Sequence, residues 1–115
     1  MNSEQMLEQI EISDNQAKEM IFKMESLLKL TKNRDFKKVI EEGYFEKEAS
    51  RAVLLKADPN MQDAEAQKSL DNQIIAIGYL RQYFTTIMQL GRMAEQEVKA
   101  NESTREEILA EQLDD

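Results

Sequence analysis

Hydrophobic positions recur at helical spacing along residues 59–100. Spacings of four and three residues alternate there, and this alternation places side chains on one face of an α-helix. Ile74, Arg81 and Met88 lie beside that face and widen it. The repeat predicts one long helix over 59–100, with an apolar face broad enough for more than one partner helix. Its members are Ala66, Leu70, Gln73, Ile77, Leu80, Phe84, Ile87, Gly91, Ala94 and Val98.

The length of this predicted helix affects the expected shape. A helix over 59–100 would span roughly 60 Å at ~1.5 Å per residue. A compact domain of this size has a radius of gyration of only about 13 Å. We therefore expect an elongated molecule in which part of the apolar face meets another subunit.

A second repeat of the same kind runs through residues 1–31 and predicts the first helix. Ser13 and Gln16 match a capping box, so a helix that restarts near Ser13 is an alternative to a continuous one. We favour a continuous helix whose first two turns are weak. The repeat consists of Met6, Ile10, Ser13, Ala17, Met20, Met24 and Leu27.

Residues 34–57 form the second helical segment in this prediction. Asn33 or Asp35 can cap its start. Gly43 lies in its first half, where it either ends a helix as a C-cap or sits within a kinked one.

The pair Asp58-Pro59 is the clearest turn signal in the chain. Proline at the first position of a helix needs no backbone donor, and an aspartate before it accepts from the free N–H groups. We expect one helix to end near Ala57 and the next to begin near Pro59. A connection this short favours neighbouring antiparallel helices.

Residues 101–115 are acidic and contain few strong apolar residues. Ser103 and Glu106 match another capping box. The segment is predicted to be either a short separate helix or a frayed extension of the long one.

Composition supports a single all-α domain over residues 1–115. Charged residues make up 33% and hydrophobic residues 41% of the chain, with only three glycines and one proline. The predicted architecture is an elongated helical hairpin or three-helix bundle with coiled-coil-like packing. The N-terminus is acidic and polar, unlike a secretory signal, and no apolar run approaches the ~18 residues that a membrane span needs.

The residue types present argue against catalysis. The chain has no cysteine and no histidine, which removes thiolate chemistry, the usual zinc ligands and the commonest general base. Its carboxylates alternate with lysine and arginine on faces expected to be solvated. The glycines are isolated, so no phosphate-binding loop is present. We therefore expect no enzyme activity, no metal and no cofactor.

Net charge is −8, which disfavours nucleic acid as a partner. One basic cluster departs from this balance, in the stretch KLTKNRDFKK. We favour the interpretation that Lys29 and Lys32 complement a helix C-terminus while the other side chains are solvated. Contact with an acidic partner or a phosphate backbone is the alternative. The cluster consists of Lys29, Lys32, Arg34, Lys37 and Lys38.

Aromatic and apolar residues on the long helix and the second segment are the candidate interface. We expect them to act as core or interface anchors rather than to line a ligand pocket. Arg81 could pair with a carboxylate such as Glu48, and Gly78 and Gly91 could allow helices to approach closely. The predicted interface residues are Phe45, Val53, Ile77, Leu80, Arg81, Phe84, Ile87, Met88 and Gly91.

Two stretches give the sequence a family resemblance: DFKKVIEEGYFEKEASRAVLLKADPNMQ and AIGYLRQYFTTIMQLGRMAEQEV. The chain resembles a group of small helical proteins, mostly uncharacterised, of tailed bacteriophages. The resemblance covers roughly residues 34–100 and brings no catalytic residues. It implies a viral origin and a role in virion assembly or in contact with the host.

The leading functional hypothesis is a non-enzymatic, oligomer-forming interaction protein in bacteriophage assembly, or a minor structural factor. It would form a homo-oligomer and bind a phage or host protein, in the host cytoplasm or in the virion. One alternative is an acidic inhibitor that mimics nucleic acid toward a basic host protein. Another is a terminase small subunit, for which the basic cluster is the only support.

Overall fold

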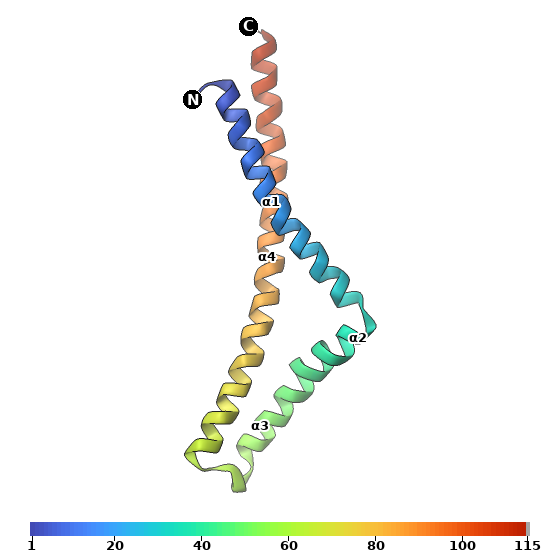
Figure 1. Ribbon diagram of the computed structural model, residues 1–115, viewed down its shortest axis with the longest axis vertical. Coiled ribbons are helices and arrows are strands. Elements are labelled where there is room, and N and C mark those ends of the chain that lie inside the picture. Colours follow the sequence, from blue (N-terminus) through green and yellow to red (C-terminus); the bar gives the residue numbers. More distant parts are fainter. Residues whose placement is uncertain (115) are drawn as a thin grey trace. The chain divides into compact units, whose positions relative to one another are not determined.

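The computed structural model describes residues 1–114. These residues form three helical rods (Figure 1). This confirms the predicted all-α class and the long C-terminal helix. The rods are α1 (Ser3–Lys32), then α2 (Arg34–Phe36), η1 (Lys37–Glu48) and α3 (Ala49–Ala57) in one continuous second rod, and finally α4 (Ala64–Asp114), which follows the short 3₁₀ turn η2 (Pro59–Met61).

The chain divides into two compact units. Unit 1 combines Met1–Leu27 with the chain from Ile87 onwards, and unit 2 is Leu28–Thr86. Helix α4 contributes its first part to unit 2 and its second part to unit 1.

Unit 1 is an antiparallel pair formed by α1 and the second part of α4. Met24 lies against Gly91, and Asp14 bonds to Asn101, so residue numbers rise along one helix as they fall along the other. Figure 1 shows the start of α1 and the end of α4 at the same end of this pair. The buried apolar residues come from both helices: Ile10, Ala17, Met24, Leu27, Ile87, Gly91, Ala94 and Ile108.

Gly91 lets the two helices of unit 1 approach closely. A Cβ atom at this position would lie 2.4 Å from the Cβ of Met24, which is far inside normal contact distance. Gly78, in unit 2, has nothing within 4 Å of a built Cβ. The predicted close approach therefore occurs at Gly91 and not at Gly78.

Helix α1 begins at Ser3 and continues through Ser13 without a second start. The Gln5 N–H donates to Asn2 Oδ1 over 2.8 Å, and the Asn2 N–H donates to Gln5 Oε1 over 3.1 Å. This reciprocal pair is a capping box. It satisfies two of the free donors at the helix start, so no second start is needed further along.

The second rod passes through Gly43 without a break. Asn33 caps its start, accepting from the Phe36 N–H over 2.9 Å. Gly43 lies within η1, a π-helix, and has no positive φ. A Cβ there would lie 3.0 Å from the Lys38 carbonyl oxygen, five residues earlier. Glycine thus relieves crowding in this wide turn and is neither a cap nor a break.

The connection to α4 is longer than the turn signal predicts. The second rod ends at Ala57 as expected, but Pro59 opens the 3₁₀ turn η2, with Asp58 accepting from the Asn60 N–H over 2.9 Å. The long helix starts at Ala64, where Asp63 accepts from the Ala66 N–H over 3.0 Å. Two aspartates therefore cap two successive elements, which delays the start of α4.

The C-terminal segment is neither separate nor frayed in the structure. Helix α4 continues unbroken to Asp114. The 4-3 repeat continues with it, because Asn101 and Arg105 are partly buried and Ile108 is buried. These residues follow Val98 at spacings of three, four and three.

Unit 2 pairs the second rod with the first part of α4 around a small core. Its buried apolar residues are Ala52, Leu70 and Ile77. Polar contacts hold the end near the turn: Lys56 forms an ion pair with Asp71, and Arg51 donates to Gln73 Oε1 over 3.1 Å.

Candidate interaction surface

Five of the seven aromatic residues gather in unit 2 and form one aromatic cluster. The Phe84 ring lies 5.9 Å from Phe36 and 5.8 Å from Phe45, measured between ring centroids. Tyr44 and Tyr83 extend the cluster on either side, at 6.0 Å from Phe45 and 6.2 Å from Phe84. Rings at these separations attract one another beyond simple area burial. The cluster ties α2 and η1 to α4.

None of the five rings is fully buried. Phe36, Tyr44, Phe45 and Phe84 are half-buried, and Tyr83 is exposed. Three of the rings stand on α2 and η1, and π-helical segments are frequent at functional sites. Half-exposed aromatic residues are typical anchors of protein interfaces. The cluster is therefore a candidate part of an interaction surface.

Unit 2 also exposes large apolar side chains on both of its rods. Leu54 is 71% exposed, Tyr79 68% and Val39 63%. Val53 and Ile75 are also more than half exposed. Ile75 and Tyr79 are four residues apart and therefore share one face of α4. We call Val39, Val53, Leu54, Ile75 and Tyr79 the outer apolar set.

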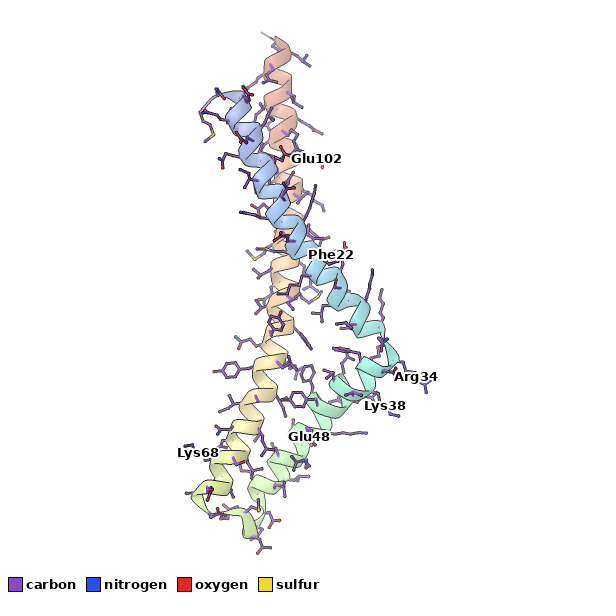
Figure 2. All side chains as sticks on the ribbon, viewed as in Figure 1. Phe22, Arg34, Lys38, Glu48, Lys68 and Glu102 are labelled. Atoms are coloured by element: carbon purple, nitrogen blue, oxygen red, sulfur yellow. The ribbon has the colours of Figure 1, made fainter. Side chains whose placement is uncertain are left out.

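A basic hollow lies at the turn between α1 and the second rod. Its lining consists of four cationic side chains and one carboxylate: Lys32, Arg34, Lys37, Lys38 and Glu42. Figure 2 shows Arg34 and Lys38 on the side of the second rod that faces away from α4.

Unit 1 contains a buried polar network that the sequence did not predict. Asp14 is only 7% exposed. It accepts from Asn101 Nδ2 over 2.9 Å and from Arg105 over 3.0 Å. Asn101 also donates to Ser13 Oγ over 3.0 Å, and Ser13 donates to Glu97 over 2.7 Å. The network thus links α1 to three successive turns of α4.

The network fixes the charge state of Asp14. The hydrogen bond from Asn101 lowers the pKa of this carboxyl most, burial opposes that effect, and Arg105 lowers the pKa further. Asp14 is therefore ionised at neutral pH although it is buried. A signal was available in the sequence, because Ser13, Asn101 and Arg105 all occupy positions of the 4-3 repeats.

The predicted interface residues lie in both units. Ile77, Ile87 and Gly91 are buried within their own unit. Phe45, Leu80, Phe84 and Met88 are half-buried, whereas Val53 and Arg81 are exposed. The contacts of Phe84 with Phe36 and Phe45 join the two rods of unit 2.

Glu48 forms its ion pair with Arg51 and not with Arg81. Arg51, three residues along the same rod, contacts Glu48 at 3.0 Å. This contact lowers the pKa of Glu48, chiefly through the hydrogen bond from Arg51. Glu48 therefore belongs to a helix-surface ion pair, which contributes little to stability.

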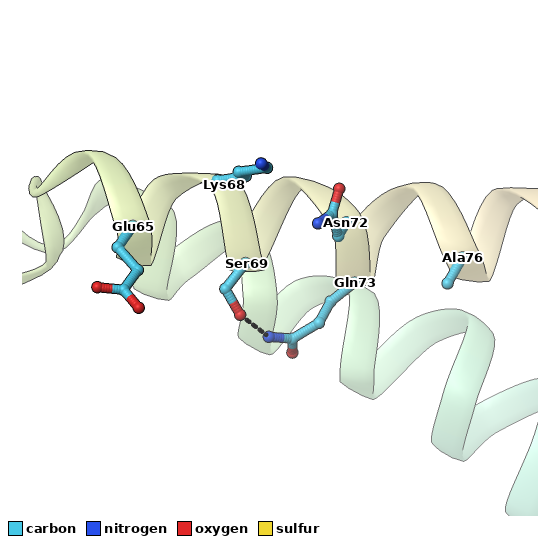
Figure 3. Close-up of a pocket in the computed structure, with 6 residues that line it drawn as sticks. All are labelled: Glu65, Lys68, Ser69, Asn72, Gln73 and Ala76. Carbon is cyan, nitrogen blue, oxygen red and sulfur yellow. Dashed lines mark hydrogen bonds between the residues drawn. The ribbon is translucent and has the colours of Figure 1, made fainter.

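A further hollow runs along the start of α4 (Figure 3). The lining residues all come from this one helix, and within it Gln73 Nε2 donates to Ser69 Oγ over 3.3 Å. An open polar surface on a single helix lacks the concave, mostly apolar walls of ligand sites. Its lining consists of Glu65, Lys68, Ser69, Asn72, Gln73 and Ala76.

Two further features are absent from residues 1–114. No group of three or more acidic side chains in this range is arranged to hold a metal ion. No helix in the same range is long and apolar enough to cross a membrane.

The half-exposed aromatic cluster, the outer apolar set and the basic hollow are thus the features with most potential for interaction. Comparison of the chain with known protein families, with curated proteins and with solved structures finds no match.

Proposed function

We propose that this chain is a non-enzymatic protein that associates with further copies of itself through unit 2. The observation that carries the proposal is the imbalance in unit 2 between a small core and a large exposed apolar surface. Three apolar residues are buried there, whereas the five of the outer apolar set are more than half exposed.

A two-helix unit with so small a core is expected to become more stable when further apolar surface is buried. Removing apolar surface from water contributes roughly 25 cal/mol per Å². The outer apolar set occupies both rods of unit 2, with Val53 and Leu54 on α3 and Ile75 and Tyr79 on α4. Each rod can therefore pack against a helix of another copy.

The half-exposed aromatic cluster supports the same proposal. Aromatic side chains are enriched at the energetic centres of interfaces. Phe84 and its neighbours bring such side chains to one region of unit 2. Assembly of a bacteriophage particle, which the family resemblance implies, is a setting in which a self-associating helical protein of this kind would act.

The test is the absolute mass of the purified protein, measured by light scattering over a wide concentration range. We expect a defined oligomer for the wild type. Tyr79→Lys should lower the mass, because a charge at a position buried by association opposes that burial. Tyr79 is largely exposed, so the helical content of the variant should be unchanged by circular dichroism.

Gln96→Lys is the matched control, since it adds the same charge at an exposed position of α4 in unit 1. It should keep the wild-type mass. A wild type that is monomeric at every concentration would refute the proposal. So would a fully retained mass in Tyr79→Lys and in a second variant, Leu54→Lys.

A further inference from the structure

The basic hollow is the strongest feature that self-association through the outer apolar set does not use. Within residues 1–114, its four cations, Lys32, Arg34, Lys37 and Lys38, make no ion pair and no side-chain hydrogen bond. Glu42 is the only carboxylate in the lining. Like charges held close together repel one another. An anionic group in the hollow would relieve that repulsion.

An acidic surface, opposite in charge to the hollow, lies near the C-terminal end of the same chain. Residues 95–114 contain seven acidic and two basic residues. The acidic residues are Glu95, Glu97, Glu102, Glu106, Glu107, Glu111 and Asp114, and the basic ones are Lys99 and Arg105.

Four residues of this region form an acidic stripe along α4. Glu102, Glu106, Leu109 and Leu113 follow one another at spacings of four, three and four, which places them on one helix face. All four are exposed, and Leu113 is 87% exposed. Ile108, which packs in unit 1, lies on a different face. The stripe combines carboxylates with two apolar side chains, of which Leu113 is almost fully exposed and Leu109 is 43% exposed beside residues of α1.

We propose that the basic hollow of one copy binds the acidic stripe of a second copy. Glu102 and Glu106 would pair with the cations of the hollow. Leu109 and Leu113 would lie against the aliphatic stems of the lysines and against Val39, which follows Lys38 in the chain and is exposed. The inference rests on the proposed self-association and adds to it a specific contact.

Such a contact joins two different surfaces, so it is heterologous. Every copy carries both a hollow and a stripe, and contacts of this type repeat from copy to copy to give rings or filaments. This mode of growth suits an assembly protein.

A second copy fits the hollow better than nucleic acid does. A net charge of −8 repels a phosphate backbone. Nucleic acid also offers no apolar side chains to place against Val39. The chain itself supplies a stripe that has both the charge and the apolar residues.

The test uses two charge-reversal variants of the full chain. In the hollow variant, Lys37→Glu and Lys38→Glu reverse two cations, and in the stripe variant, Glu102→Lys and Glu106→Lys reverse two carboxylates. All four positions are exposed, so both variants should keep the wild-type helical content. Each should associate about tenfold more weakly than the wild type, by sedimentation velocity at low salt.

Mixing the two variants provides the decisive control. The hollow variant still has an acidic stripe, which matches the unchanged hollow of the stripe variant. The reversed stripe also matches the reversed hollow. We therefore expect the mixture to recover wild-type association, and a chain with all four substitutions to recover it as well.

Four outcomes would overturn the inference. If both variants keep wild-type mass while Tyr79→Lys lowers it, the hollow is not a contact, although the proposed function stands. If both variants weaken and the mixture does not recover, the two surfaces do not pair. If the wild type binds duplex DNA with a steep salt dependence that the hollow variant lacks, the hollow serves nucleic acid instead. A wild type that is monomeric throughout refutes both proposals.

Discussion

In both units a second helical segment packs against helix α4, but the residues at the contact differ. In unit 1, Gly91 of α4 lets Met24 of α1 approach closely, and a hydrogen-bonded polar network links the same two helices. In unit 2, large aromatic residues join the rods, and only Ala52, Leu70 and Ile77 are buried. Unit 1 thus buries more apolar residues than unit 2 does, although Phe22 and Met93 of unit 1 are also largely exposed. One continuous helix, α4, can therefore pack against α1 of its own chain along one part and contact another copy along a different part.

The largest effect should come from truncating the core of unit 1. Ile108→Ala should lower the free energy of unfolding by about 2–4 kcal/mol, because the side chain is buried and leaves a cavity. Leu54→Ala in unit 2 should change it by less than about 0.5 kcal/mol in dilute, dissociated protein. Urea unfolding followed by circular dichroism measures both. Equal losses would remove the distinction between the units.

Breaking the polar network should come next. Asp14→Ala leaves the donors of Asn101 and Arg105 without their acceptor and should cost about 1–3 kcal/mol of unfolding free energy. Glu19→Ala, at an exposed position of the same helix, is the control and should be within about 0.5 kcal/mol of the wild type. If the two variants are equally stable, the network does not hold the helices together.

A pair of glycine substitutions should change stability in opposite directions. Gly91→Ala forces a Cβ against Met24 and should cost about 1–3 kcal/mol in spite of the better helix propensity of alanine. Gly78→Ala meets open space and should stabilise the protein by about 0.5–1 kcal/mol. Thermal melts of the two variants give the comparison. A stabilising Gly91→Ala would mean that α1 and α4 are not in close contact.

The smallest effect concerns pH. The folded-state pKa of Asp14 lies below its ordinary value of 3.8. The contribution of its ionised form is therefore complete above that value and is lost as the pH falls through the lower, folded pKa. The stability difference between the wild type and Asp14→Asn should shrink as the pH drops below about 4. Unfolding titrations at pH 7 and pH 3 measure it, and a constant difference would contradict the ionised assignment.

Hydrophobic periodicity predicts the presence of the long helix but not its bounds, which are Ala64–Asp114, and burial on α4 follows the predicted repeat closely. Leu70, Ile77, Ile87 and Ala94 are all buried at positions of the predicted repeat. Met20 of the first repeat is exposed instead. Asp14 lies four residues after Ile10 and three before Ala17, so it shares their buried face although it is outside the predicted repeat.

Polar pairing and wide helical turns were harder to predict. Asp14, Asn101 and Arg105 are not singled out by the sequence analysis, because the burial of Asp14 depends on partners that are some 90 positions away. The spacing of apolar residues likewise does not indicate that the chain is π-helical around Gly43. The predicted interface residues are placed by the structure, but their role toward a second copy stays a prediction.

Amide hydrogen exchange at low and high protein concentration tests the contrast between the units most directly. If copies associate through unit 2, protection of the amides in residues 37–57 and 64–86 should rise with protein concentration, because association covers them. Protection in residues 3–27 should stay the same, because unit 1 is already paired. Protection that is independent of concentration throughout, or that rises only in residues 3–27, would contradict the assignment of unit 2 as the association surface.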